Sequence, residues 1–183
     1  MATMGALRWP QVLVAVLAAA VIAGAVTAAL VGGKGSGVTV AVPAPPAEGV
    51  GSSTVELSAD AAAHPMGDAV RATTQRHFDA INAKDYAAWT FTVVPERVKE
   101  QPEAVWRKGY RSTKDGTIQV ARIDRLGPDR LLMLVYFVSI QEPADAPPNL
   151  RAPRICWRAA FPMIGSPPLI DVGRAGSLQY TAC

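Results

Sequence analysis

One short stretch of the chain carries three side chains that could move protons. Residues 75–89 read QRHFDAINAKDYAAW and hold His77, Asp79 and Asp85 within fifteen residues. An imidazole beside a carboxylate can serve as a general acid–base pair, because the pKa of histidine lies near neutrality. This chemistry requires the three side chains to meet, so it depends on the elements that carry them.

The spacing of apolar residues predicts an amphipathic helix before and through this stretch. The positions at intervals of three and four are Met66, Val70, Thr74, His77, Phe78 and Ile81. Asp79 lies two positions after His77, about 200° around such a helix, and is expected to face solvent. Asp85 is a plausible N-cap of a short second helix through Trp89. The three side chains are therefore not expected to converge, and His77 is interpreted as a partly buried scaffold residue.

Four residues are nevertheless candidates for lining a ligand pocket: His77, Trp89, Trp106 and Tyr110. The alternative for the aromatic residues is core packing of helices against a sheet. No spacing of residues in the chain points to a metal site, a cofactor or a nucleophile. The expectation is thus no catalytic residue and no cofactor, with an acid–base enzyme kept as the alternative.

The elements around these residues indicate an α+β domain. Pro95 is expected to stop the second helix, and a third helix is expected over residues 102–112. Asp115-Gly116 reads as a turn. Four strand regions follow, at 117–123, 131–140, 154–161 and within 168–182. The order predicts about three helices packed on one face of an antiparallel sheet. The strand at 131–140 is apolar on both faces, which predicts a central strand covered on both sides, or a strand at a subunit interface.

The N-terminal part of the chain has a different character. Residues 12–31 form an uncharged, apolar run of twenty residues, long enough to cross a bilayer as a helix. We expect a transmembrane helix over 9–33, with a short cytoplasmic tail at 1–8. A cleaved signal peptide is the alternative, but its apolar region is usually only about 7–15 residues long. Arg8 favours a cytoplasmic N-terminus and an extracytoplasmic C-terminal domain.

Residues 34–65 are rich in Gly, Ser, Pro and Ala and are expected to form a flexible linker. The domain is then expected over 66–183. Beyond the basic residues that flank the apolar run, sixteen Lys and Arg stand against fifteen Asp and Glu. A nearly neutral domain gives no electrostatic footprint for nucleic acid. The bilayer, through residues 12–31, is the expected partner, and a protein partner or a second copy of the chain is left open.

The chain has two cysteines, Cys156 and Cys183. An even number of cysteines in a small domain outside the cytosol predicts a disulfide. Two unrelated thiols, one buried and one exposed, are the alternative.

The domain resembles the NTF2-like (SnoaL-like) superfamily, in which a curved sheet wraps around three helices. The resemblance is carried by AVRATTQRHFDAINAKDYAAW, PEAVWRKGYRS and the strands from Thr117 onward. SIQEPADAPPNLRAPRICW and the terminal YTAC also resemble membrane-anchored extracytoplasmic members from bacteria. In those proteins a cysteine in a late strand is thought to pair with one at the C-terminus.

The resemblance leaves the function open, because one fold carries many activities. We expect a non-catalytic extracytoplasmic domain that serves protein assembly or ligand binding. A membrane-tethered isomerase- or cyclase-like enzyme acting on a small apolar ligand is one alternative. A subunit of a secretion or lipid-transport complex is another.

Overall fold

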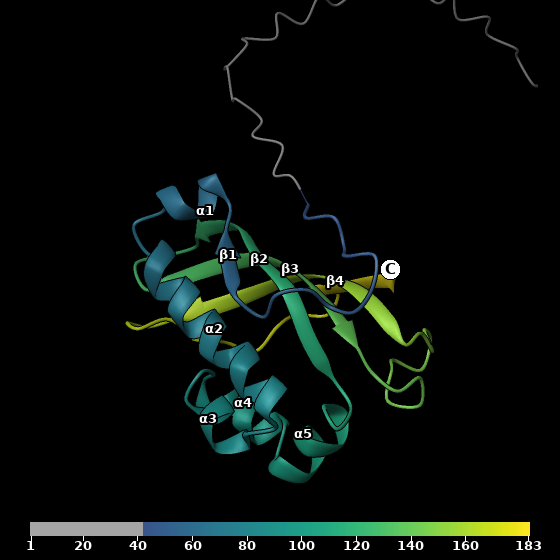
Figure 1. The fold of residues 1–183 in the computed structure, drawn as a ribbon. Coiled ribbons are helices and arrows are strands. Elements are labelled where there is room, and N and C mark those ends of the chain that lie inside the picture. Colours follow the sequence, from purple (N-terminus) through teal and green to yellow (C-terminus); the bar gives the residue numbers. More distant parts are fainter. Residues whose placement is uncertain (1–41) are drawn as a thin grey trace, which may run out of the picture. The chain divides into compact units, whose positions relative to one another are not determined.

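The computed structural model describes residues 42–183 of the chain (Figure 1). The expected cytoplasmic tail, the transmembrane helix and the first part of the linker lie outside these residues. Within residues 42–183 every helix is too short or too polar to cross a membrane. The structure therefore bears on the C-terminal domain, and the membrane anchor stays a prediction from the sequence.

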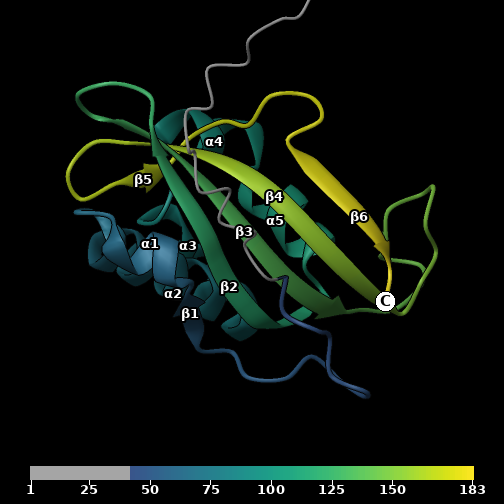
Figure 2. The ribbon, with the colours of Figure 1, turned by 90° about the horizontal axis from the view of Figure 1, so that it is seen from above.

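A six-stranded mixed sheet forms the centre of the domain (Figure 2). Its strands are β1 (Val55–Leu57), β2 (Lys114–Arg125), β3 (Arg130–Ile140), β4 (Arg154–Ile164), β5 (Leu169–Ile170) and β6 (Leu178–Ala182). They are ordered β1-β2-β3-β4-β5, and β6 pairs with the other half of β4. β1 runs parallel to β2. The expectation of a purely antiparallel sheet is thus wrong at one edge, because β1 lies within residues 34–65, whose composition predicts a linker.

The domain begins before residue 66, so the expected boundary between linker and domain is wrong. Val50 and Val55 are buried, and β1 pairs with residues 118–120 of β2. Helix α1 (Ala59–Ala63) follows, with Ser58 as its N-cap. The Ser58 hydroxyl also donates a 2.6 Å hydrogen bond to the Ala121 carbonyl. A three-residue strand and a five-residue helix are too short to produce a readable hydrophobic period, which explains the error.

The other helices cover one face of the sheet (Figure 1). They are α2 (Gly67–Ala83), α3 (Tyr86–Thr90), α4 (Pro95–Glu100) and α5 (Glu103–Gly109). α2 buries the expected stripe, and Lys84 ends it in the left-handed conformation at φ 59°. Asp85 caps α3 as expected, since its carboxylate accepts a 2.9 Å hydrogen bond from the Ala88 N–H. Helices α1 and α4 were not expected.

Pro95 illustrates why α4 was missed. It stops α3 from continuing, as the sequence indicates, but it also occupies the first turn of α4. Proline suits that position because its missing N–H would have no partner inside the helix. The third expected helix is present as α5, which begins and ends inside the expected range.

Strand β3 lies between β2 and β4, so its expected central position is confirmed. Met133 and Val135 are fully buried beneath the helices. On the opposite face, Leu134 and Tyr136 are only half-buried. The second cover expected over this strand is therefore incomplete in the described chain.

The disulfide links the end of the chain to β4. Cys156 and Cys183 are bonded, with their Cα atoms 5.1 Å apart. In the β4–β6 ladder, Cys156 lies opposite Thr181, two residues before Cys183. The predicted pair is confirmed, and the alternative of two separate thiols is wrong.

Candidate functional site

A cavity of about 430 Å³ lies between the helices and the sheet. Its walls come from α2, α4 and α5 on one side and from β2, β3 and β4 on the other. The loop after β3 and Leu178 of β6 complete the wall. Most of the lining is aromatic or aliphatic: Phe78, Ile81, Trp106, Phe137, Trp157 and Phe161. The volume falls within the range of roughly 300–1,000 Å³ typical of small-molecule sites.

Three of the four residues named from the sequence lie on this cavity wall. His77, Trp106 and Tyr110 line it, whereas Trp89 does not. Trp89 is fully buried behind the wall, with its ring centroid 5.7 Å from that of Trp106. Trp89 is thus a core residue that supports the wall from behind.

His77 is held in one neutral form by Thr92. Its Nδ1 lies 2.8 Å from the Thr92 hydroxyl oxygen, and that hydroxyl donates a 2.7 Å hydrogen bond to the Trp89 carbonyl. Since the hydroxyl hydrogen is already used, Nδ1 must carry a proton and donate. Burial, with a smaller contribution from the charge of Arg97, lowers the pKa of His77 to about 3. His77 is neutral at physiological pH, with its unprotonated Nε2 as an acceptor.

The two carboxylates near His77 in the sequence do not reach it. Asp79 is exposed and accepts a 2.9 Å hydrogen bond from the Gln75 side chain. Asp85 is occupied as the cap of α3. The three residues that opened the question therefore form no acid–base constellation.

The acid group of the cavity is a different residue, Asp115. Its side chain is 2% exposed and lines the cavity, and its Oδ1 has no hydrogen-bond partner. Burial raises its pKa to about 7, against the opposing attraction of Lys84. A carboxyl group in this state can donate or accept a proton near neutral pH.

No pattern in the sequence points to Asp115, because an Asp-Gly pair is typical of a turn. That interpretation is wrong: both residues lie in β2, and Asp115 pairs with Ser139 of β3. The Asn82 side chain fixes the backbone there, accepting from the Asp115 N–H at 2.7 Å and donating to its carbonyl at 3.0 Å. Gly116 is required by close approach, since a Cβ atom would lie 2.6 Å from the Val50 carbonyl oxygen.

Tyr110 and Arg97 are the other ionisable groups of the wall. Burial raises the pKa of the Tyr110 hydroxyl, opposed by the charge of Arg97. Burial lowers the pKa of Arg97, opposed by Tyr110, Glu100 and Asp171. Tyr110 interacts electrostatically with both Arg97 and Asp115. The polar groups therefore share one apolar chamber.

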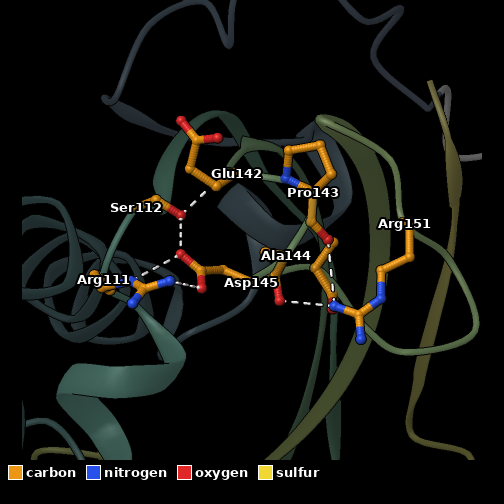
Figure 3. Close-up of polar contacts among 8 residues, drawn as sticks. Arg111, Ser112, Glu142, Pro143, Ala144, Asp145 and Arg151 are labelled. Carbon is orange, nitrogen blue, oxygen red and sulfur yellow. Dashed lines mark hydrogen bonds and ion pairs between the residues drawn. The ribbon is translucent and has the colours of Figure 1, made fainter.

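The loop from Gln141 to Pro153, here called the strap, closes one side of the cavity with Ala146, Pro147 and Pro148. At one end Asp145 accepts hydrogen bonds from Arg111 and from the Ser112 hydroxyl (Figure 3).

Arg151 ties the strap to itself. Its Nη1 donates to the carbonyls of Pro143, Ala144 and Ala146, at 3.3, 2.7 and 3.2 Å (Figure 3). These bonds hold a proline-rich loop in a defined position against the cavity.

The strap is also joined to the cavity floor. Trp157 Nε1 donates a 2.6 Å hydrogen bond to the Ser139 hydroxyl, which donates to Gln141 at 2.7 Å. The Gln141 amide in turn donates to the Ala152 carbonyl at 2.7 Å. This chain of bonds positions Trp157 and the strap together.

The arrangement is suited to holding a molecule of limited size. Aromatic walls would contact an apolar body, and Asp115 and Tyr110 would contact a polar group. Within residues 42–183, no three His, Cys, Asp or Glu side chains are grouped in a way that could hold a metal ion.

Comparison of the chain with protein-family models, with curated proteins and with solved structures found no match.

Proposed function

We propose that the chain is a membrane-anchored protein whose extracytoplasmic, NTF2-like domain binds a small, mainly apolar molecule in its cavity. The observation that carries the proposal is the buried Asp115 carboxyl, which lines an aromatic chamber and has an oxygen without a partner. A buried polar atom without a partner costs about 1–3 kcal/mol. A ligand with one hydrogen-bonding group would recover that cost, and its apolar body would pack against the aromatic walls.

The anchoring and the compartment rest on separate observations. Residues 12–31 are apolar over the length of a membrane span. The Cys156–Cys183 bond supports a domain outside the cytosol, because reducing compartments rarely preserve structural disulfides. The segment between anchor and domain is shorter than the sequence indicated, since the fold already includes Val50 and Val55.

Ligand binding can be tested with 2-naphthamide, a neutral probe with an apolar body and one polar group. Trp106 and Trp157 line the cavity, so a bound ligand should change the intrinsic fluorescence of the protein. The titration would use the full chain in phosphatidylcholine nanodiscs. Saturable binding with one site per chain is expected.

Gly109 offers a way to block the cavity. It lies on the wall, and a Cβ atom there would meet nothing within 4 Å. We expect Gly109→Phe to place a ring in the chamber without disturbing the helix, and to abolish saturable binding. Gly127→Phe, in the turn between β2 and β3 and away from the cavity, is the matched control and should bind normally. Binding that is equal in both variants would refute the cavity as the site.

A second candidate function is proton transfer, as in an isomerase. The observation in its favour is the pKa of Asp115, which burial places at about 7. A general base is most effective when its pKa lies near the working pH. Tyr110 would be available as a hydrogen-bond donor to a carbonyl oxygen in the same chamber.

The enzyme candidate can be tested with 2-acetylnaphthalene, whose methyl protons are acidic because they adjoin a carbonyl group. Proton NMR in D₂O would follow their replacement by deuterium. Catalysis predicts exchange that is faster with wild-type protein than with Asp115→Asn. Equal exchange rates would reject proton transfer by Asp115 and leave the binding function standing.

A further inference from the structure

Arg97 is the one cavity-lining charge that lacks a partner of opposite charge within the described part of the chain. Three charged side chains line the cavity: Arg97, Asp115 and Asp145. Asp145 is bonded to Arg111, and Asp115 is largely neutralised by burial below pH 7. No carboxylate oxygen of residues 42–183 lies within 4.0 Å of the Arg97 guanidinium.

The known contacts of Arg97 leave most of its donors free. Nη1 donates a 3.2 Å hydrogen bond to the main-chain carbonyl of Asp171. The guanidinium carbon lies 5.3 Å from the centroid of the Phe161 ring, which also lines the cavity. This is the only hydrogen bond that the guanidinium makes within residues 42–183, although it carries five N–H donors.

The two carboxylates that attract Arg97, Asp171 and Glu100, form no ion pair with it. The Asp171 carboxylate accepts from Arg130 at 3.4 Å and from the Val172 N–H at 2.8 Å. Glu100 is on the same helix and is exposed. Burial lowers the pKa of Arg97 despite the attraction of both carboxylates. Arg97 is half-buried, and its positive charge is only partly compensated by these carboxylates.

We propose that the ligand of this cavity is a small apolar carboxylic acid whose carboxylate binds Arg97. This inference rests on the binding function proposed above and names its ligand class. The planar fork of a guanidinium matches the two oxygens of a carboxylate, which favours a bidentate pair. A singly charged anion neutralises one arginine, whereas a phosphate dianion would leave one charge unpaired in an apolar chamber.

The neighbouring side chains suit this assignment. Gln101 also lines the cavity, and its side-chain oxygen is buried without a partner. Because the two ends of an amide are nearly indistinguishable by shape, its NH₂ group can take that position and donate to an anion. His77 is neutral and adds no competing charge. The apolar body would then lie against Phe137 and Trp157.

The test compares 2-naphthoate with the neutral 2-naphthamide and the cationic 2-naphthylmethylammonium, three probes of nearly the same shape. The full chain in phosphatidylcholine nanodiscs would be titrated at a pH of about 6, where a typical carboxylic acid is ionised and Asp115 is mostly protonated. We expect 2-naphthoate to bind on the order of tenfold or more tightly than 2-naphthamide. We expect the cation to bind most weakly.

Variants then assign the effect to one side chain. Arg97→Gln should remove the preference for 2-naphthoate, because the bidentate pair with the carboxylate is lost. The affinity for 2-naphthamide should change less than about threefold, because a neutral amide forms no ion pair with Arg97. Arg97→Lys should retain part of the preference. Arg130→Gln is the matched control, because Arg130 also contacts Asp171 but does not line the cavity. It should leave all affinities unchanged.

The outcomes separate the inference from the function beneath it. If 2-naphthamide binds as tightly as 2-naphthoate to wild-type protein, the ligand class is wrong and the binding function stands. The same holds if Arg97→Gln weakens both probes equally. If no probe binds, the binding function itself fails. The wild-type comparison needs no variant, so a folding defect in Arg97→Gln would not protect the proposal.

Discussion

Replacement of Asp115 by asparagine should stabilise the protein at alkaline pH and do so progressively less as the pH falls. Asparagine keeps the shape of the side chain but cannot ionise. In the folded wild type, burial raises the pKa of Asp115 from 3.8 to about 7. The group is thus protonated in the folded state over a pH range where it is ionised in the unfolded state.

The sign follows from linkage. Below pH 3.8 the carboxyl group is protonated in both states, so its ionisation makes no contribution to the free energy of unfolding. Between 3.8 and about 7 the folded state must retain a proton that the unfolded chain releases, so the wild type loses stability as the pH rises. Each pKa unit corresponds to about 1.4 kcal/mol, and the full loss is therefore about 4 kcal/mol.

The free energy of unfolding should be measured by urea titration of the full chain in mild detergent. Between pH 5 and pH 8, the stability of Asp115→Asn relative to wild type should rise by about 3 kcal/mol. Lys84 and Tyr110 also interact with the Asp115 carboxyl group. Both residues are present in the wild type and in the variant, so the comparison reports on the ionisation of Asp115. Asp129→Asn, at an exposed turn position, is the control and should show no such rise. A pH-independent difference for Asp115→Asn would refute the buried, largely neutral carboxyl.

Three further predictions concern the rest of the chain. Cys183→Ser should lower the free energy of unfolding by about 3.5 kcal/mol, because the bond closes a loop with a sequence separation of 27; reductant should destabilise the wild type and leave the variant unchanged, and an insensitive wild type would contradict this. Thr92→Val should cost about 1–3 kcal/mol in urea titration, because it leaves the buried Nδ1–H of His77 without an acceptor; a cost no larger than that of Thr90→Val would show that the bond contributes nothing. Intact-mass analysis of the mature protein should find segment 12–31 retained, and a mature N-terminus beyond about residue 27 would establish a cleaved signal peptide instead.

The long, periodic and capped elements could be predicted from the sequence. Helix α2 buries Val70, His77 and Ile81 as their spacing of three and four indicates. Asp85 starts α3 because an aspartate before a short helical pattern is a strong local signal. The central position of β3 followed from an apolar run without alternation.

The elements that were missed depend on contacts between distant residues. β1 exists because Val55 pairs with Ile118, and no local pattern in three residues could report this. Asp115 is buried, and its main chain is held by hydrogen bonds to the side chain of Asn82, which lies 33 residues earlier in the sequence. An Asp-Gly pair is typical of turns, and only the close approach of Val50 explains the glycine within a strand.

Only the part of the candidate site that depends on local helix spacing could be predicted from the sequence. Tyr110 and Trp106 follow the spacing of one helix face, so their shared position on the wall could be anticipated. Trp89 is also an aromatic residue of a short helix, but it is fully buried in the core and does not line the cavity. Arg97 was not considered because α4 is only six residues long and begins at the proline that was interpreted as a stop.

A co-crystal structure of the protein with 2-naphthamide would test most directly whether the cavity is a ligand site. The account predicts one molecule inside the chamber, its rings against Phe137 and Trp157 and its amide within hydrogen-bonding distance of Asp115. The Oδ1 atom of Asp115, which has no hydrogen-bond partner in the structure, should form a hydrogen bond with the probe. A cavity that holds only water at saturating probe, or a probe bound elsewhere on the domain, would contradict it.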